Sequence, residues 1–200
     1  MSTPRYQAFT TPVGEAIFPW ITKPDTEYDQ NGKFKTDLAV PFEEAQSFIA
    51  KLEQVRDAFI QTLPVNKQKT LTPRPVYTEE YTRPDYPEGA TKEEKKAIRD
   101  AWEGEPTGNV VFRFSLKAHV DTKDGGFDQA PVVVSASTGE AIEEPVYGGS
   151  MVRLRGQVVP YTNDAAGMVG VTLRFKACQV IELVSGSSGG SSFWTDFDEE

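Results

Sequence analysis

Ser150–Leu183 reads SMVRLRGQVVPYTNDAAGMVGVTLRFKACQVIEL and contains two alternating runs around a turn. In both runs apolar side chains alternate with polar ones at a period of two, which predicts two half-buried antiparallel strands. The apolar positions are Val152, Leu154, Val158, Val171, Leu173, Phe175 and Ala177. The outward positions include the four cations Arg153, Arg155, Arg174 and Lys176. Because a lone strand pair is barely stable in water, further strands must complete a sheet or barrel.

Other segments show the same strand pattern. They are Glu15–Ile21, Lys33–Val40, Asn109–Val120 and the shorter Pro131–Ser137. The first two flank the favoured turn dipeptide Asn31-Gly32 and are expected to form a hairpin. Pro19 lies within the first of them and pushes it toward a sheet edge or a bulge. In the third, Arg113, Lys117 and His119 are expected to point outward.

Phe42–Leu63 is predicted to be a long helix. Its apolar residues recur at steps of three and four and form one continuous stripe. Pro41 suits the first turn, and Pro64 ends the helix. A stripe this full is expected to cover the open end or face of a sheet, and a groove for a partner helix is the alternative.

The segment from about residue 64 to 107 is predicted to be an insertion. Its prolines break any long element, and a capping box from Thr91 to Glu94 predicts a short helix that ends near Trp102. Long loops in compact domains are usually functional or disordered. Three tyrosines lie among basic side chains here, an arrangement that suits stacking on nucleobases. The alternative is that the segment is a structural flap. These tyrosines are Tyr77, Tyr81 and Tyr86.

The order of elements is two strands, a helix, an insertion and four strands. It predicts a mainly β protein with one long helix (α+β), built on an OB-fold-like, five- or six-stranded antiparallel barrel. A β sandwich is the alternative. Residues 1–184 would form this domain, 185–192 a flexible Ser/Gly linker, and 193–200 an acidic aromatic tail.

The net charge of the chain is −9, of which the tail contributes four charges, so that the remainder is still acidic. A single cysteine, Cys178, and a single histidine, His119, exclude a Cys/His zinc site and argue against nucleophilic catalysis. No catalytic activity, metal or cofactor is expected. No apolar run is long enough to span a membrane, and the N-terminus lacks a signal pattern, so a cytoplasmic protein is expected.

Binding chemistry is better represented than catalytic chemistry. Six cations are predicted to point outward from three strands, where they could neutralise phosphates or form an ordinary solvated exterior. They are Arg113, Lys117, Arg153, Arg155, Arg174 and Lys176. The aromatic residues expected to stack on nucleobases are Trp20, Tyr77, Tyr81 and Tyr147.

The tail carries apolar rings among acids, a composition that docks onto basic and apolar pockets of partner proteins. Its residues are Phe193, Trp194, Asp196, Phe197, Asp198, Glu199 and Glu200. Together, Gly186–Ser192 and the tail that follows it resemble the C-terminal end of bacterial and phage single-stranded-DNA-binding proteins. The tail lacks the final Pro-Phe of the bacterial proteins. The whole chain resembles the OB-fold single-stranded-DNA-binding proteins of tailed phages.

This resemblance implies a non-catalytic protein that coats single-stranded DNA (ssDNA) with little sequence preference during replication, recombination or repair. It also implies that the tail recruits replication or recombination enzymes in the cytoplasm of the host cell, and a homo-oligomer is compatible with it. The alternative is a β-rich phage structural or assembly protein with a partner-binding tail. A metal-dependent nuclease is a weaker candidate.

Overall fold

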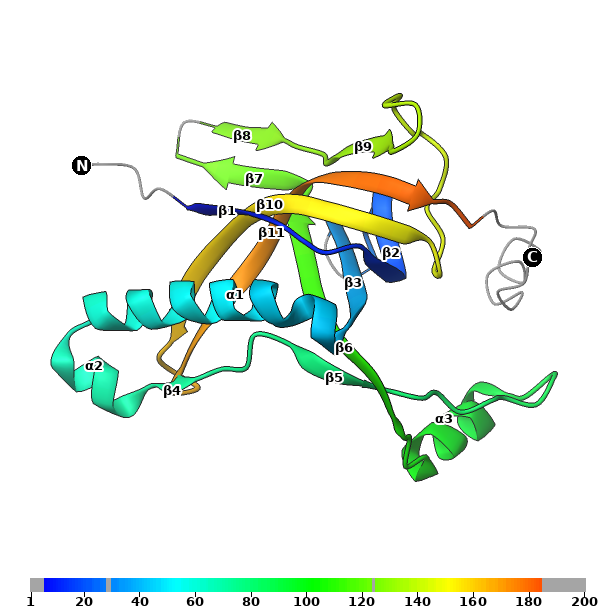
Figure 1. The fold of residues 1–200 in the computed structure, drawn as a ribbon, viewed down its shortest axis with the longest axis horizontal. Coiled ribbons are helices and arrows are strands. Elements are labelled where there is room, and N and C mark those ends of the chain that lie inside the picture. The colour runs from blue at the N-terminus through cyan, green and yellow to red at the C-terminus, as the bar shows by residue number, and fades with distance from the viewer. Residues whose placement is uncertain (1–5, 28–29, 124, 185–200) are drawn as a thin grey trace.

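The computed structural model describes residues 6–27, 30–123 and 125–184. Within these ranges, five strands pair in a closed ring in the order β2–β3–β6–β11–β10 and back to β2 (Figure 1). The five strands are β2 (Gly14–Asp25), β3 (Lys33–Pro41), β6 (Pro106–Lys117), β10 (Met151–Asn163) and β11 (Met168–Glu182). The ring confirms the predicted OB-fold-like architecture. The prediction of a wholly antiparallel barrel is wrong, because β11 pairs with β6 in parallel.

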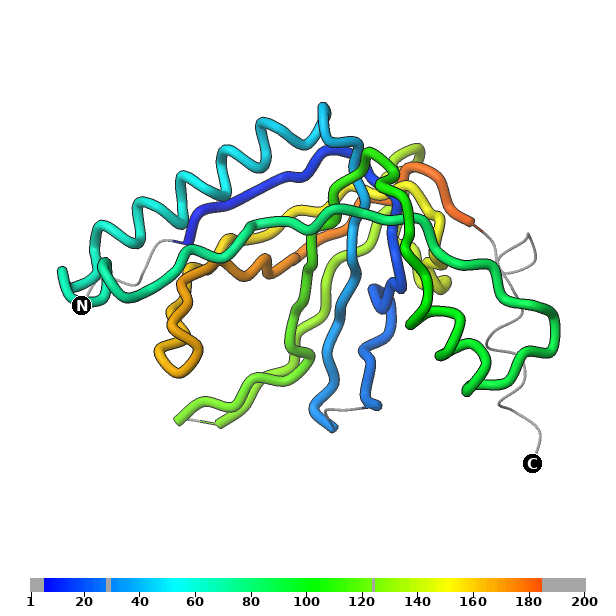
Figure 2. Tube along the Cα trace, turned by 90° about the horizontal axis from the view of Figure 1, so that it is seen from below, coloured from blue at the N-terminus to red at the C-terminus, as the bar shows by residue number. Residues whose placement is uncertain are grey.

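Shorter elements extend the ring. Strand β1 (Gln7–Thr10) pairs with β10, β5 (Thr78–Tyr81) pairs with β6, and both β4 (Thr72–Pro73) and β9 (Val132–Ser135) pair with β11. Strands β7 (His119–Thr122) and β8 (Gly125–Asp128) form a separate hairpin. The helices are α1 (Phe42–Thr62), α2 (Val65–Thr70) and α3 (Lys92–Ala101). Figure 2 shows α1 on one side of the molecule and the tips of β2, β3 and the β7–β8 hairpin on the other.

Helix α1 fills the ring from the end at which β3 leaves it. Its buried residues Ala45, Phe48, Ile49 and Leu52 belong to the same core cluster as the inward side chains of the strands. The ring of Phe48 lies 5.0 Å from that of Phe112 in an edge-on arrangement, which favours the aromatic contact beyond its buried area. The predicted core role of the helix is therefore confirmed for its first three turns.

The capping box of the insertion also forms as expected. The Thr91 hydroxyl accepts from the Glu94 backbone N–H, and the Glu94 carboxylate accepts from the Thr91 backbone N–H. Both of these N–H groups at the start of α3 therefore have hydrogen-bond partners.

The shortest elements show too little periodicity to be predicted from the sequence. Strand β1 has only one buried residue, Phe9, among its four, too few to show a period. The strand predicted to run from Asn109 to Val120 is interrupted at Ala118, and the residues that follow contribute to the β7–β8 hairpin. The Ala118 N–H donates to the Gly32 carbonyl at 3.0 Å, and this contact separates β6 from the hairpin.

Gly156 permits the closest approach of the two long strands. The register of β10 against β11 shifts between Arg155 and Gly156, a bulge in the pair. A Cβ added at Gly156 would overlap the carbonyl oxygen of Arg174 and would lie 2.7 Å from the Phe175 Cα. Only a residue without a side chain fits between these backbones.

We therefore expect Gly156→Ala to lower the free energy of unfolding by about 1–3 kcal/mol, because the strands must separate to admit the methyl group. Chemical denaturation measures this loss. Gly148→Ala is the matched control, since the nearest atom to its added Cβ is 3.8 Å away. Equal stability of the two variants would show that β10 and β11 can separate here without cost.

Candidate nucleic-acid interface

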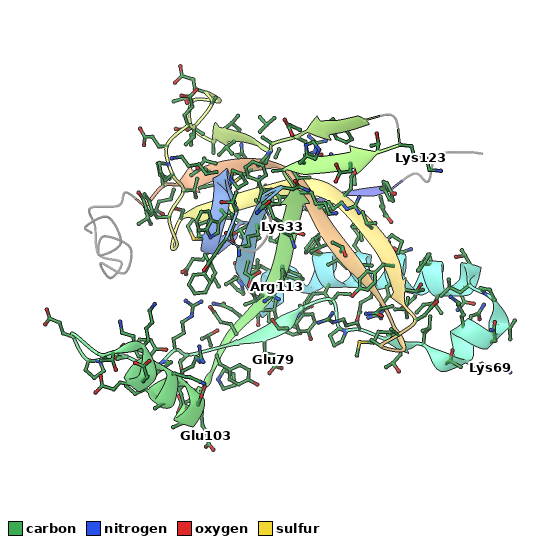
Figure 3. All side chains as sticks on the ribbon, turned by 180° about the vertical axis from the view of Figure 1, so that it is seen from behind. Lys33, Lys69, Glu79, Glu103, Arg113 and Lys123 are labelled. Carbon is green, nitrogen blue, oxygen red and sulfur yellow. The ribbon has the colours of Figure 1, made fainter. Side chains whose placement is uncertain are left out.

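The outward positions of β3 and β6 form one continuous surface, which we call the basic strand face. The cross-strand pairs that build it are Lys33 with Lys117, Lys35 with Ser115, and Asp37 with Arg113. Paired residues of an antiparallel ladder point to the same side, so these side chains share the exterior of the ring. Lys33 and Arg113 lie on the side of the sheet turned toward the viewer in Figure 3. The surface carries four cations and one acid.

Two of the four cations are already partnered. Lys35 forms an ion pair with Asp25, whose side chain is only 7% exposed. This hydrogen bond, together with one from the Glu27 backbone N–H, holds the pKa of Asp25 below its ordinary value. The Arg113 Nε lies 3.2 Å from Asp37 Oδ1, but the arginine side chain is 85% exposed. An ion pair this exposed contributes at most about 1 kcal/mol, so Arg113 can exchange its partner.

Lys33 and Lys117 are different, because they lie directly opposite each other. Both are exposed, and no carboxylate of the described residues lies within ion-pair distance of either one. Like charges at such a position destabilise a sheet by a few tenths of a kcal/mol up to about 1 kcal/mol. A polyanion lying across the two strands would remove this repulsion.

The predicted cations on β11 adjoin this face, whereas those on β10 lie beyond it. Strand β11 pairs with β6 through Leu173 and Phe114, which places the exposed Arg174 beside the outward row of β6. Lys176 donates to Gln129 Oε1 at 3.1 Å, and the Gln129 N–H donates to the Ala118 carbonyl at the end of β6. The exposed Arg153 and Arg155 are on β10, one strand further from β6. The structure thus brings Arg113, Lys117, Arg174 and Lys176 together on adjacent strands.

The predicted stacking residues have different surroundings. Trp20 is half-buried and pairs with Lys35, so it borders the basic strand face. Tyr81 and Tyr147 are 49% and 45% exposed. Tyr77 instead packs against the core, with its ring 6.4 Å from those of Phe42 and Phe112. The core uses the Tyr77 ring and leaves Trp20, Tyr81 and Tyr147 as the accessible candidates.

Lys33 and Lys35 are not among the contacts predicted from the sequence, although the sequence carries a signal for them. Both alternate with the buried Phe34 and Thr36, the same period of two that identified the outward cations of the other strands. What the pattern could not show is that β3 is the neighbour of β6, which makes Lys33 the partner of Lys117.

The reactive side chains have structural surroundings. Cys178 is buried in the core, and burial raises the pKa of its thiol to about 12, as expected for a small core residue without nucleophilic character. Among the residues that the structure describes, no group of three or more His, Cys, Asp or Glu side chains could hold a metal ion. In the same ranges, no helix is both long and apolar enough to cross a membrane. The tail residues 193–200 lie outside the described ranges.

No protein-family model matches the sequence. A stretch of 96 residues is 30% identical to the single-stranded DNA-binding protein of Enterobacteria phage T3, and this match spans 46% of the chain and only 41% of that protein. In fold, the chain is similar to gp2.5, a single-stranded DNA binding protein encoded by bacteriophage T7 (TM-score 0.64, 22% identity, 98% of this chain and 96% of that one). It is also similar to the single-stranded DNA-binding protein from bacteriophage Enc34 in complex with ssDNA (TM-score 0.52, 14% identity, 89% and 88%). The predicted resemblance to phage single-stranded-DNA-binding proteins is confirmed.

His119 lies between two carboxylates at the far end of the basic strand face. Its Nδ1 is 2.6 Å from Asp128 Oδ1 across the β7–β8 hairpin, and its Nε2 is 3.3 Å from Asp121 Oδ1. The hydrogen bond to Asp128, with the charges of both carboxylates, raises the pKa of His119. A raised pKa means that the folded hairpin favours the protonated ring. The stabilisation of the folded hairpin by protonated His119 is therefore complete below the ordinary histidine pKa of about 6.5. It is lost as the pH rises through the pKa that His119 has in the folded protein.

We expect the single histidine signal in a proton NMR titration to move with a pKa above about 6.5. The protection of the β7 and β8 amides, taken relative to the intrinsic exchange rate at each pH, should fall as the pH rises through the pKa of His119. Asp128→Asn removes the nearer carboxylate and should return the pKa toward its ordinary value. A wild-type titration at or below the ordinary value would contradict the pairing seen in the hairpin.

Proposed function

We propose that this protein binds ssDNA without catalysis and that the basic strand face is the surface that holds the DNA backbone. The observation that carries the proposal is the cross-strand pair of Lys33 and Lys117, which face each other while no carboxylate of the described residues forms an ion pair with either. Asp25 lies opposite Lys33 on β2, but it is held by Lys35. Phosphates spaced along a single strand would neutralise these lysines and release condensed counterions.

The position of the face within the ring supports this assignment. In OB-folds, the second and third strands of the barrel and the loops at their ends bind oligonucleotides. In the order of this ring those strands are β3 and β6, the two that carry the basic strand face. The fold shared with the bacteriophage T7 and Enc34 proteins, and the sequence similarity to the phage T3 protein, agree with the same function.

The proposal extends to the biological role. The protein would coat ssDNA with little sequence preference during phage replication, recombination or repair in the host cytoplasm. Its tail, through Phe193, Trp194 and Phe197, would recruit enzymes of these processes. Arg153, Arg155, Arg174 and Lys176 stay predicted contacts along the remainder of the DNA path, and Trp20 and Tyr147 stay predicted stacking residues.

Salt-dependent titration of labelled oligo(dT) tests the basic strand face. Each lost phosphate contact should flatten the slope of log K against log salt by about 0.7, so we expect about 0.7 for Lys33→Ala or Lys117→Ala and about 1.4 for the double variant. Lys69→Ala, the same charge loss on the exposed surface of α2, should leave the slope unchanged. Wild-type protein that shows no affinity for oligo(dT) at low salt would refute ssDNA binding itself.

Deletion of residues 193–200 tests the proposed tail. It removes four acidic side chains, which would compete with phosphates for the basic surface. We expect the truncated protein to bind oligo(dT) several-fold more tightly at low salt, with the gain fading near physiological salt because screening weakens exposed charge pairs. Pull-down of replication or recombination proteins from nuclease-treated lysate should be lost together with the tail. Unchanged affinity would remove the competition, and undiminished pull-down would remove the recruitment.

A further inference from the structure

Phe18 has an unusual backbone and an unusual exposure. Its φ is +47°, and it is the one residue other than glycine with a positive φ among the described residues. Its side chain is 67% exposed, the largest exposed fraction of any large apolar residue in those ranges. A bulky residue rarely adopts positive φ, and such strain typically costs about 1–3 kcal/mol. The core gains nothing from it, because the ring points away from the interior.

A bulge in β2 explains how the ring is directed outward. Ile17 pairs with Asp37 and Trp20 pairs with Lys35, so three residue steps of β2 lie against two of β3. The extra residue falls at Phe18–Pro19, where the proline could not donate a ladder hydrogen bond. Bulges at such places re-aim a side chain, and here the side chain is an aromatic ring.

The ring forms one wall of a hollow between β2 and the insertion. This hollow has a volume of about 360 Å³. Its lining includes Phe18, Tyr81, Arg83 and Gly149. The Arg83 guanidinium lies 4.8 Å from the centre of the Phe18 ring, a cation–π distance, so it covers the ring face in the absence of DNA.

The hollow continues the basic strand face toward α1. Ile17 and Ala39 belong to outward positions of β2 and β3, yet they are only 7% and 3% exposed. The cross-strand pair of Asp37 and Arg113 lies beside Ile17, one step along the same outward row. Phe18 follows Ile17 in β2, so a single strand that turns from Arg113 across β3 would reach Phe18.

The chemistry of the hollow suits a nucleobase better than a run of phosphates. Two aromatic rings and a guanidinium are the groups on which unpaired bases stack. Glu15 and Glu80 line the hollow, and Glu79 precedes Glu80 in β5. Glu80 accepts from Thr107 and Asn109, and Glu79 accepts from the Tyr81 hydroxyl. These carboxylates repel phosphates, but they do not repel the uncharged face of a nucleobase.

We propose that Phe18 is a stacking platform for one nucleobase of bound ssDNA and that Arg83 moves from its ring to the phosphate of the same nucleotide. The bulge in β2 supplies the platform, and the insertion supplies the cation. This assignment rests on the proposed ssDNA binding, and it gives the insertion a part in holding the strand.

Three substitutions at one position separate stacking from packing. Phe18→Tyr keeps the aromatic face and should bind oligo(dT) like the wild type. Phe18→Leu keeps apolar bulk without that face, and with Phe18→Ala it should bind about 5- to 150-fold more weakly, the range for loss of one stacked base. The log K against log salt slope should stay unchanged in all three, because stacking releases no counterions. Thermal unfolding verifies that each variant is folded.

Arg83→Ala should behave differently and flatten the slope by about 0.7, the loss of one phosphate contact. Photocrosslinking to oligonucleotides containing 5-iodouracil should label the peptide that carries Phe18 in the wild type, with much less labelling in folded Phe18→Leu. If the wild type binds oligo(dT) and Phe18→Leu binds equally well with equal crosslinking, the platform is refuted and ssDNA binding stands. If the wild type does not bind, the proposed function fails first.

Discussion

Two short contacts close the ring, and the aromatic core supports one of them directly, through Phe114. Strand β11 meets β6 at one residue pair, Leu173 with Phe114, and β10 meets β2 at two pairs. So few ladder bonds cannot hold a closed sheet alone, since each contributes only about 1 kcal/mol net. The ring of Phe9 packs 5.7 Å from that of Phe48 on α1 and 5.6 Å from that of Phe114 on β6. Helix α1, strand β1 and strand β6 are therefore held by one aromatic cluster, and β6 is one of the two strands that carry the basic strand face.

This internal cluster leaves the exterior of the ring free for charge. Alternate residues of β3, and of β6 from Val110 onward, are buried in the core, whereas the charged residues of the basic strand face stay at least partly exposed. Function can therefore place like charges opposite each other, as at Lys33 and Lys117, at a cost far below the stabilisation that the core provides. Positive φ at Phe18 is a local cost of the same kind on the same exterior.

The period of two predicted the long strands and the outward cations, and the period of 3.6 predicted α1, because each of these elements buries one complete face. The same reasoning failed for β1, β4 and β5, which are too short to show a period and are held by the strands they join. Partners across strands lie beyond a local pattern as well. Lys33 belongs to the site because β3 adjoins β6. Phe18 belongs to it because the bulge in β2 turns its ring outward, where Arg83 covers it.

An acidic chain can present a surface for phosphates when its acids are already committed. Asp25 is buried against Lys35 and has a lowered pKa, so it stays charged and paired. Asp37 holds Arg113 through an exposed contact, and a phosphate can take the place of this carboxylate without desolvating a new charge. The net charge of −9 then acts at longer range, where salt screens it over about 8–10 Å. Repulsion discourages unspecific contact with DNA elsewhere on the protein, and the local cations decide where a strand can lie.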